Sequence, residues 1–248
     1  MNTRAPVKSR YFLLSTGRCG SSLLAAILTH AGADFGERYR GQWDARTGAF
    51  ESSAVGRATA HYRRSLALRS ASHLSTWRMW HRKLHRALGQ IYLRLAMKRA
   101  PFAKCGDSVI PLLARKLGYR PGVVFLYRHY VDQTFSAHQR HGIGYAELME
   151  SYYNHNSTAL MTVQVYGGCV VSYEEIMDVS ETAWAAALAR TTGLDAETIL
   201  ASRAKIVCPQ PPATRRIVPS DPRADALLTQ LADFRERYIE ADRLGERS

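Results

Sequence analysis

Short apolar runs alternate along the chain with longer segments that carry a helical pattern of apolar residues. The runs RYFLLS (10–15), VVFLYR (123–128) and CVVSY (169–173) have the β-branched and aromatic character of buried strands. Segments with helical periodicity separate these strands. Strands that alternate with helices favour a parallel sheet covered on both faces. The sequence therefore predicts a three-layer α/β fold, a central parallel sheet flanked by helices.

The helical pattern also sets the expected organisation of the chain. Residues 33–53 are Gly-rich and polar with scattered aromatic residues, which predicts a long loop, and such loops are usually functional. We interpret residues 1–248 as one domain with a basic helical insertion at about 54–102 and a C-terminal helix at about 221–244. Helices are expected at 21–32, 54–100, 131–141, 144–166, 181–193, 195–204 and 221–243.

Positive charge is unevenly distributed along this chain. The formal net charge is +13, and the stretch between Glu51 and Asp107 has twelve Arg and Lys residues but no acidic one. A field of one sign favours anionic partners, such as a phosphorylated cofactor, an acidic acceptor, a membrane surface or nucleic acid. A solvated basic helix face explains the 57–104 region equally well, and charge alone does not choose between these interpretations.

Composition excludes several classes of protein. Hydrophobic residues make up 46% of the chain, and no run approaches the roughly 18 consecutive apolar residues of a membrane span. The short apolar run after Lys8 ends at Gly17-Arg18, so we do not expect a signal peptide. The four cysteines are far apart and lack metal-ligand spacing, which indicates a reducing compartment with neither disulfides nor zinc. We expect a cytoplasmic protein, with peripheral membrane contact left open.

The turn after the first strand has the features of an anion-binding loop. Its sequence, TGRCGSS (16–22), precedes the expected helix, so the backbone N–H groups from Gly17 to Ser22 would lie at a helix N-terminus. Glycine allows close backbone approach, Ser21 and Ser22 can donate hydroxyl hydrogen bonds, and Arg18 adds a fixed positive charge. An ordinary strand–turn–helix corner is the alternative interpretation.

This loop differs from the phosphate loop of nucleoside triphosphatases. The Gly-Lys-Ser/Thr ending is absent, and so is a clear second-strand aspartate for magnesium. A monophosphate, or a phosphate carrying a second small anion, suits the loop better. Two further strand ends should lie beside it: Arg128, with Ser136 eight residues later, and Tyr173-Glu174.

Together these segments resemble the sulfotransferases that use 3′-phosphoadenosine 5′-phosphosulfate (PAPS). The first loop of that family typically reads Arg/Lys-Ser-Gly-Thr-Thr/Ser-Leu-Leu, and this chain has RCGSSLL at 18–24 in register. A second family motif places a strand-end Arg and a Ser eight residues later on the 3′-phosphate, as Arg128 and Ser136 would be. The family's Tyr-Glu-Asp/Glu-Leu strand end resembles YEEI at 173–176. The resemblance covers about residues 10–176.

The chain also departs from the family pattern in two places. Many members have Asp-Pro after the second-motif Arg, where this chain has His129-Tyr130. The Arg-Lys-Gly signature of many animal members is absent after Lys205. We name Arg215 or Arg216 only as a candidate to take the place of that signature.

The resemblance implies a P-loop-kinase-like fold and sulfuryl transfer from PAPS to an acceptor hydroxyl, with PAP as product and no metal. It places the co-substrate on Gly17, Arg18, Cys19, Gly20, Ser21, Ser22, Arg128, Ser136 and Tyr173. Arg18 would neutralise charge on the leaving phosphate. The general base would be Glu37 in GADFGERYR, which we rank first, or Glu51 in TGAFESS, since both resemble bases of bacterial branches. Each could instead be a loop cap or an ion-pair partner. Histidines serve as base in animal cytosolic members, and His61, His73, His81, His85 and His129 keep that option open.

The acceptor is not specified by these motifs. A carbohydrate, a glycolipid or another small and anionic molecule is expected, with tyrosine less favoured. One alternative function is an ATP-dependent small-molecule or nucleotide kinase on the same fold. Another is a non-enzymatic nucleic-acid-binding protein that uses the basic region, although no nucleic-acid-binding motif supports it.

Overall fold

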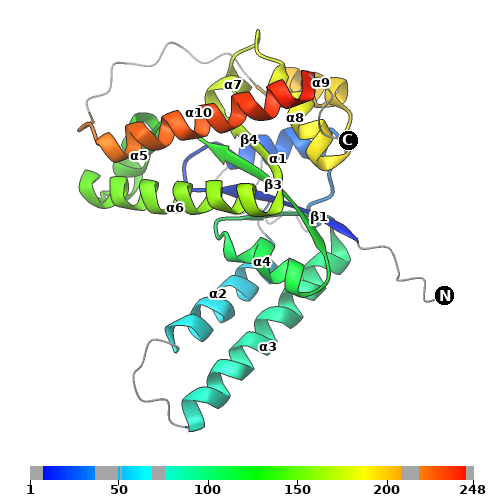
Figure 1. Ribbon diagram of the computed structural model, residues 1–248, viewed down its shortest axis with the longest axis vertical. Helices are drawn as coiled ribbons and strands as arrows, with labels where there is room; N and C mark the ends of the chain where they lie inside the picture. Colours follow the sequence, from blue (N-terminus) through cyan, green and yellow to red (C-terminus); the bar gives the residue numbers. More distant parts are fainter. Residues whose placement is uncertain (1–7, 37–49, 51, 69–75, 208–217, 244–248) are drawn as a thin grey trace, which may run out of the picture.

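A four-stranded, all-parallel sheet lies at the centre of the protein (Figure 1). The computed structural model describes residues 8–36, 50, 52–68, 76–207 and 218–243. The strand order is β2-β1-β3-β4, so the strand that precedes the loop is an interior one. This confirms the predicted α/β class and the parallel sheet. The strands are β1 (Ser9–Ser15), β2 (Phe102–Cys105), β3 (Arg120–Tyr127) and β4 (Gly168–Ser172).

Most of the expected helices lie within two residues of their predicted bounds. The 54–100 segment contains two helices, α2 and α3, and the residues between them, 69–75, lie outside the described part of the chain. The helices are α1 (Ser21–His30), α2 (Ser53–Ala67), α3 (Thr76–Arg99), α4 (Val109–Lys116), α5 (Tyr130–His141), α6 (Tyr145–Tyr166), α7 (Tyr173–Met177), α8 (Ala183–Thr192), α9 (Ala196–Ile206) and α10 (Pro222–Arg243).

Alternate side chains of each strand enter two different cores. Along β3, Val123 and Phe125 pack in the core that includes α4, α6 and α10, whereas Val124 and Leu126 pack in the core with α1, α8 and α9. The period of two follows from strand geometry, and it requires helices on both faces of the sheet. Because both faces of the sheet are buried, the sequences of its strands are nearly continuous apolar runs.

The connections from the two middle strands leave toward opposite faces of the sheet. After β1 the chain enters α1 on one face, and after β3 it enters α5 and α6, the latter packed on the other face. Neighbouring parallel strands whose connections diverge leave a crevice at their carboxyl ends, where ligands of open α/β sheets bind. The loop after β1 and Arg128 after β3 both lie at this crevice.

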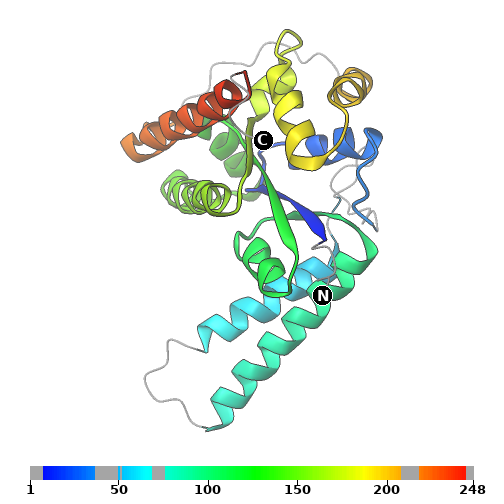
Figure 2. The same cartoon turned by 45° about the vertical axis from the view of Figure 1, so that its right-hand side comes forward.

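Helices α2 and α3 extend together away from the sheet as a helical hairpin (Figures 1 and 2). They pack closely at Gly89 of α3, where an added Cβ atom would lie 3.3 Å from the carbonyl oxygen of Ala58. The base of the hairpin joins the core beneath β1 and β2 through Val55 and Met97. Among the described residues, no helix is both long and apolar enough to cross a membrane.

Two features of the fold were not predicted from the sequence. β2 has only four residues, one of them Lys104, and α4 follows it after three residues. β3 begins at Arg120, so Pro121 and Gly122 lie inside the strand and not before it. Gly122 is suited to this position because the Tyr11 ring of β1 lies only 2.8 Å from where its Cβ would be.

Candidate functional site

The loop between β1 and α1 has a constrained backbone. Arg18 has φ +68° and Gly20 has φ +89°, both in the left-handed region, which is unusual for the non-glycine residue. Gly20 also caps α1 and contributes no side-chain hydrogen bond to its first turn. The N–H groups of that turn therefore remain directed toward the crevice, where an anion would satisfy them.

The Tyr173 ring lies directly against this loop. A Cβ atom at Gly20 would be only 2.3 Å from Cδ2 of Tyr173, so glycine is required both by the backbone conformation and by the ring. The ring also contacts Arg128, whose Cζ lies 4.4 Å from the ring centroid in a cation–π contact. Tyr173 thus joins the loop to the end of β3.

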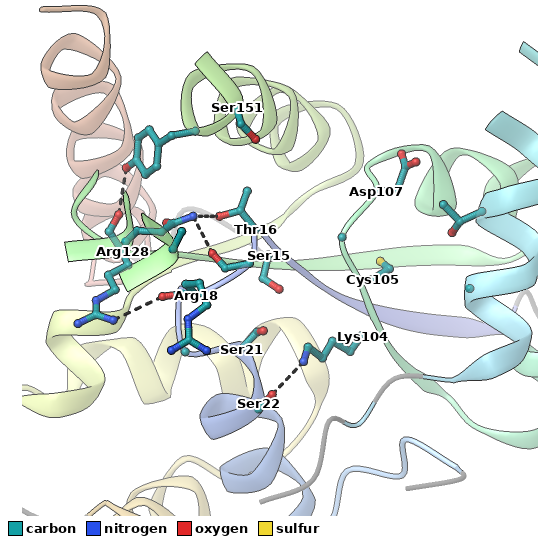
Figure 3. A pocket seen from close by; sticks show the side chains of 18 of the residues that line it. Ser15, Thr16, Arg18, Ser21, Ser22, Lys104, Cys105, Asp107, Arg128 and Ser151 are labelled. Carbon is teal, nitrogen blue, oxygen red and sulfur yellow. Dashed lines mark hydrogen bonds between the residues drawn. The ribbon is translucent and has the colours of Figure 1, made fainter. Parts of the chain in front are cut away.

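The second predicted segment meets the loop, although more than 100 residues separate them in sequence. Nε of Arg18 donates a hydrogen bond to Oγ of Ser136, at 3.1 Å. Nη1 of Arg128 donates to the carbonyl oxygen of Arg18, at 3.4 Å (Figure 3). The structure therefore brings Arg18, Arg128, Ser136 and Tyr173 together at one edge of the sheet.

A glutamine of α5 fixes the start of the loop. Nε2 of Gln133 donates to the Oγ1 of Thr16 and, at 3.0 Å, to the carbonyl oxygen of Gly17. The hydroxyl of Tyr152 on α6 donates to the carbonyl oxygen of Arg128, at 3.0 Å. These bonds use the carbonyl groups of the loop and of the strand end, so the N–H groups and cationic side chains face the crevice.

The turn after Arg128, at His129-Tyr130, is stabilised by two hydrogen bonds from backbone N–H groups. The backbone N–H of His129 donates to Oε1 of Glu174, at 3.1 Å, and its ring Nδ1 accepts from the N–H of Val131 at the start of α5. Glu174 of the YEEI segment therefore holds the first residue after Arg128. The carboxyl ends of β3 and β4 are thus in contact at this turn.

Positive charge gathers around the loop. Partial burial, followed by the nearby charges of Arg140 and Arg128, lowers the pKa of the Arg18 guanidinium from its usual value. Among the described residues, the buried Nε of Arg128 has no hydrogen-bond partner. Like charges held this close repel one another, so a bound anion would stabilise the cluster.

A lysine reaches the loop from the neighbouring strand. Lys104 of β2 is buried, and its Nζ donates to Oγ of Ser22 at 3.0 Å. Figure 3 shows Lys104 on the far side of Ser22 from the arginine pair. Cationic groups therefore approach the first turn of α1 from two sides. Cys19 lies beneath the loop, and burial raises the pKa of its thiol, which makes it an inert packing residue.

A cavity of about 1450 Å³ is lined by residues of the loop between β1 and α1 and by Lys104, Arg128, Gln133 and Tyr173. The far wall belongs to α2, through residues such as Ser53 and Thr59, and to α6 through Ser151. Pockets for small ligands usually measure about 300–1,000 Å³, so this cavity has room for a nucleotide and a second molecule.

Asp107 is the one carboxylate among the described residues that line the cavity. Its Oδ2 accepts from Nε of Arg63 at 2.8 Å, and its Oδ1 accepts from the N–H of Val109 at the start of α4. Both carboxylate oxygens are therefore engaged by structural partners. In Figure 3 Asp107 lies away from Arg18 and Arg128.

Several residues predicted for the site lie outside the described part of the chain. They are Glu37, Glu51, His73, Arg215 and Arg216. Of the candidate histidines, His61 and His85 contact each other in the hairpin, and His129 caps α5. Another histidine, His141, lines the cavity.

Sequence reasoning missed Lys104, Gln133 and Arg140. Lys104 was counted only as part of the basic region, because the short β2 strand was not recognised. The signal that could have found it is the apolar pair Phe102-Ala103 followed by a lysine and a glycine turn. Gln133 and Arg140 lie on α5, one helical turn on either side of Ser136, and the helical period could have placed them there.

Comparison of the chain with protein-family models, with curated proteins and with solved structures finds no match. The described residues contain no group of three or more His, Cys, Asp or Glu side chains placed to hold a metal ion. The chemistry of the site is therefore argued from its own residues.

Proposed function

We propose that this protein is a PAPS-dependent sulfotransferase that acts on an acceptor hydroxyl. The observation that carries the proposal is the meeting of two motifs at one strand edge: Arg18 bonds to Ser136, and Arg128 bonds to the carbonyl of Arg18. These are the residues on which the resemblance to sulfotransferases rests.

The arrangement of the sheet supports a P-loop-kinase-like fold. The loop follows an interior strand of an all-parallel sheet, at the crevice where the connections diverge. Its constrained backbone and the uncapped first turn of α1 suit an oxyanion.

The cationic groups suit a ligand with two separated anionic ends. The loop amides, Arg18 and Lys104 would hold the 5′-phosphosulfate, and Arg128 with Ser136 would hold the 3′-phosphate. The buried Nε of Arg128, which donates to no atom in the described part of the chain, is a donor suited to that phosphate. The cavity volume leaves room for the acceptor beside α2.

Sulfuryl transfer requires little covalent participation by the protein. The acceptor oxygen forms a bond to sulfur while the bond from sulfur to the phosphate oxygen breaks, PAP leaves, and the acceptor proton passes to a base. Arg18 and Lys104 would stabilise the charge that develops on the leaving phosphate. One preorganised donor of this kind lowers a barrier by about 3 kcal/mol.

A carboxylate that serves as general base must have an oxygen free to take the proton. Both oxygens of Asp107 are already bonded, to Arg63 and to the N–H of Val109. We therefore keep Glu37 and Glu51 as the proposed bases. Glu37→Gln should reduce turnover strongly and leave PAP affinity nearly unchanged; if turnover persists, Glu51→Gln should show that behaviour.

Calorimetric titration with PAP tests the proposal directly. We expect the wild-type protein to bind PAP without magnesium, and to convert PAPS with labelled sulfur to PAP in the presence of acceptors. Arg128→Ala should weaken PAP binding much more than binding of adenosine 5′-phosphate, which lacks the 3′-phosphate. Arg115→Ala is the matched control, since Arg115 of α4 stacks on Tyr166 of α6 and does not line the cavity. Absence of any PAP binding by the wild type would refute the proposal.

One observation favours a kinase as the second candidate. Asp107 follows the strand beside β1, where a magnesium-binding carboxylate would be useful. Its ion pair with Arg63 argues against this role. Binding of ATP that requires magnesium, without binding of PAP, would favour the kinase over the sulfotransferase.

A further inference from the structure

The outward face of α3 carries an apolar stripe that no described part of the chain covers. Its members are large, and each is 45% to 70% exposed: Trp77, Trp80, Leu84, Ile91 and Leu95. The intervals of 3, 4, 7 and 4 residues place them on one side of the helix. The buried residues Gly89, Leu93 and Ala96 lie on the opposite side, in the direction of α2 and the core.

Cations border this stripe. Lys83, Arg94 and Lys98 are exposed, and their helical positions fall along one edge of the apolar residues. The stretch from residue 52 to residue 106 contains no acidic residue. On this helix, exposed tryptophan and aliphatic side chains lie beside charged residues that are all cationic. Globular surfaces rarely expose this combination.

We propose that α3 docks this face on an anionic lipid bilayer, lying in the plane of the interface. Tryptophan favours the boundary between headgroups and acyl chains, and the stripe would enter that boundary. Lysine and arginine at the border would contact lipid phosphates while their apolar stems pack beside the stripe. The protein would be held by one helix face and would not span the membrane.

Charge complementarity selects this partner over a second copy of the chain. Two such faces brought together would place cations against cations, without a carboxylate in either hairpin to offset them. A nucleic acid would match the charge but would make little use of the tryptophans and aliphatic residues. A negatively charged bilayer matches both the apolar stripe and its border.

The position of the hairpin fits this role. Figures 1 and 2 show α2 and α3 extending from the sheet, and α2 contributes Ser53 and Thr59 to the cavity wall. Docking through α3 therefore leaves the strand-edge site on the other side of α2. The inference does not depend on the proposed sulfotransferase activity.

Cosedimentation with vesicles tests the proposal. We expect the full-length protein to bind phosphatidylcholine vesicles that contain phosphatidylglycerol, and to bind pure phosphatidylcholine vesicles much less. Trp77→Ser with Trp80→Ser should reduce the binding at least about tenfold, because two large apolar groups no longer enter the interface. Lys83→Gln with Arg94→Gln and Lys98→Gln should reduce it by about a hundredfold.

The matched control is Met161→Ser with Val165→Ser on α6. These residues are 63% and 65% exposed, so the change removes a similar apolar exposure from a different face. Vesicle binding should remain at the wild-type level in this control. Circular dichroism and the thermal midpoint should show that all variants are folded.

Three results would overturn the proposal. One is equal vesicle binding by the tryptophan variant and its α6 control. Another is binding to a DNA duplex without any binding to anionic vesicles. The third is a dimer in sedimentation that dissociates on substitution of Trp77 and Trp80 and does not bind vesicles. In each case PAP binding would remain a separate test of the strand-edge site.

Discussion

The strand-edge site and the α2–α3 hairpin are both strongly cationic, but they hold their charge differently. At the site, Lys104 is buried, Arg128 is partly buried, and hydrogen bonds to Ser22 and to the carbonyl of Arg18 fix their directions. On the hairpin, Lys83 and Arg94 are exposed and border an apolar stripe. The cations of the strand-edge site converge on one point, whereas the cations of the hairpin are spread along a surface.

This difference suits the two kinds of anionic partner that we propose, a nucleotide and a lipid bilayer. Converging and preorganised donors recognise a discrete anion, because their orientation is fixed before the ligand arrives. Exposed cations are screened by salt and gain little from any single contact, so they act together on an extended surface. Net charge alone does not distinguish these cases, whereas burial and hydrogen bonding do. Variants in one region should therefore leave the readout of the other unchanged.

The largest expected effect comes from Gly20→Ala, which would break the anion site and leave the hairpin intact. A left-handed alanine costs about 1–2 kcal/mol of stability, and the new Cβ would also displace the Tyr173 ring, 2.3 Å away. Because the ring supports Arg128, PAP affinity should fall about a hundredfold. Calorimetry and a thermal melt measure the two effects.

The double variant Gly20→Ala with Tyr173→Ala separates the two causes. It removes the collision and keeps the backbone strain, so it should recover part of the lost stability but not the PAP affinity. Vesicle binding by the single variant should equal that of the wild type. Loss of vesicle binding there would mean that the two regions are not independent.

A smaller effect is expected for Lys104→Met, which keeps the apolar stem and removes the charge. Hydrogen bonds to charged groups contribute about 1.5–3 kcal/mol, so PAP affinity should fall roughly tenfold to a hundredfold. Ser22→Ala is the control, since it removes the hydroxyl partner and leaves the charge in the cavity; its effect should be smaller. Equal effects would assign Lys104 a purely structural role.

The parts predictable from the sequence are those with strong local patterns. β3, β4 and the long helices α6 and α10 have periodic apolar residues, and the loop after β1 has glycines next to an arginine. The four-residue β2 strand carries only a weak signal, the apolar pair Phe102-Ala103, and this signal does not place Lys104 next to Ser22. Its place in the sheet depends on pairing with β1, a contact between residues about 90 positions apart.

Arg18, Arg128, Ser136 and Tyr173, which the structure brings together, could be named from the sequence, but their mutual contacts could not. Spacing of eight residues indicated that Arg128 and Ser136 act together, yet Ser136 contacts Arg18 instead. Contacts of this kind depend on which strands are neighbours, and local pattern does not determine strand order. The apolar stripe of α3 was likewise hidden, because periodicity shows that a helix has an apolar face but not whether another element covers it.

The smallest effect concerns the hairpin alone and its response to pH. Nδ1 of His61 and Nδ1 of His85 lie 2.8 Å apart between α2 and α3, so one ring must donate and the other accept. Burial, followed by the proximity of His61, lowers the pKa of His85 from its ordinary value near 6.5. The unfolded chain therefore binds the proton more readily than the folded one, and the pair stabilises the fold above about pH 6.5.

Acidification through that range should loosen the hairpin before it affects the sheet. As pH falls below about 6.5 and through the lowered pKa of His85, the folded chain takes up a proton at His85 less readily than the unfolded chain, so the thermal midpoint drops. His85→Gln should reduce that drop by about one or two degrees, since the pair is only partly buried and its contribution is small. His155→Gln on α6 is the control and should leave the drop unchanged.

PAP binding measured across the same range should not differ between His85→Gln and the wild type, because His85 does not line the cavity. A difference in PAP binding would show that the hairpin and the strand-edge site are coupled, whereas we expect them to be independent.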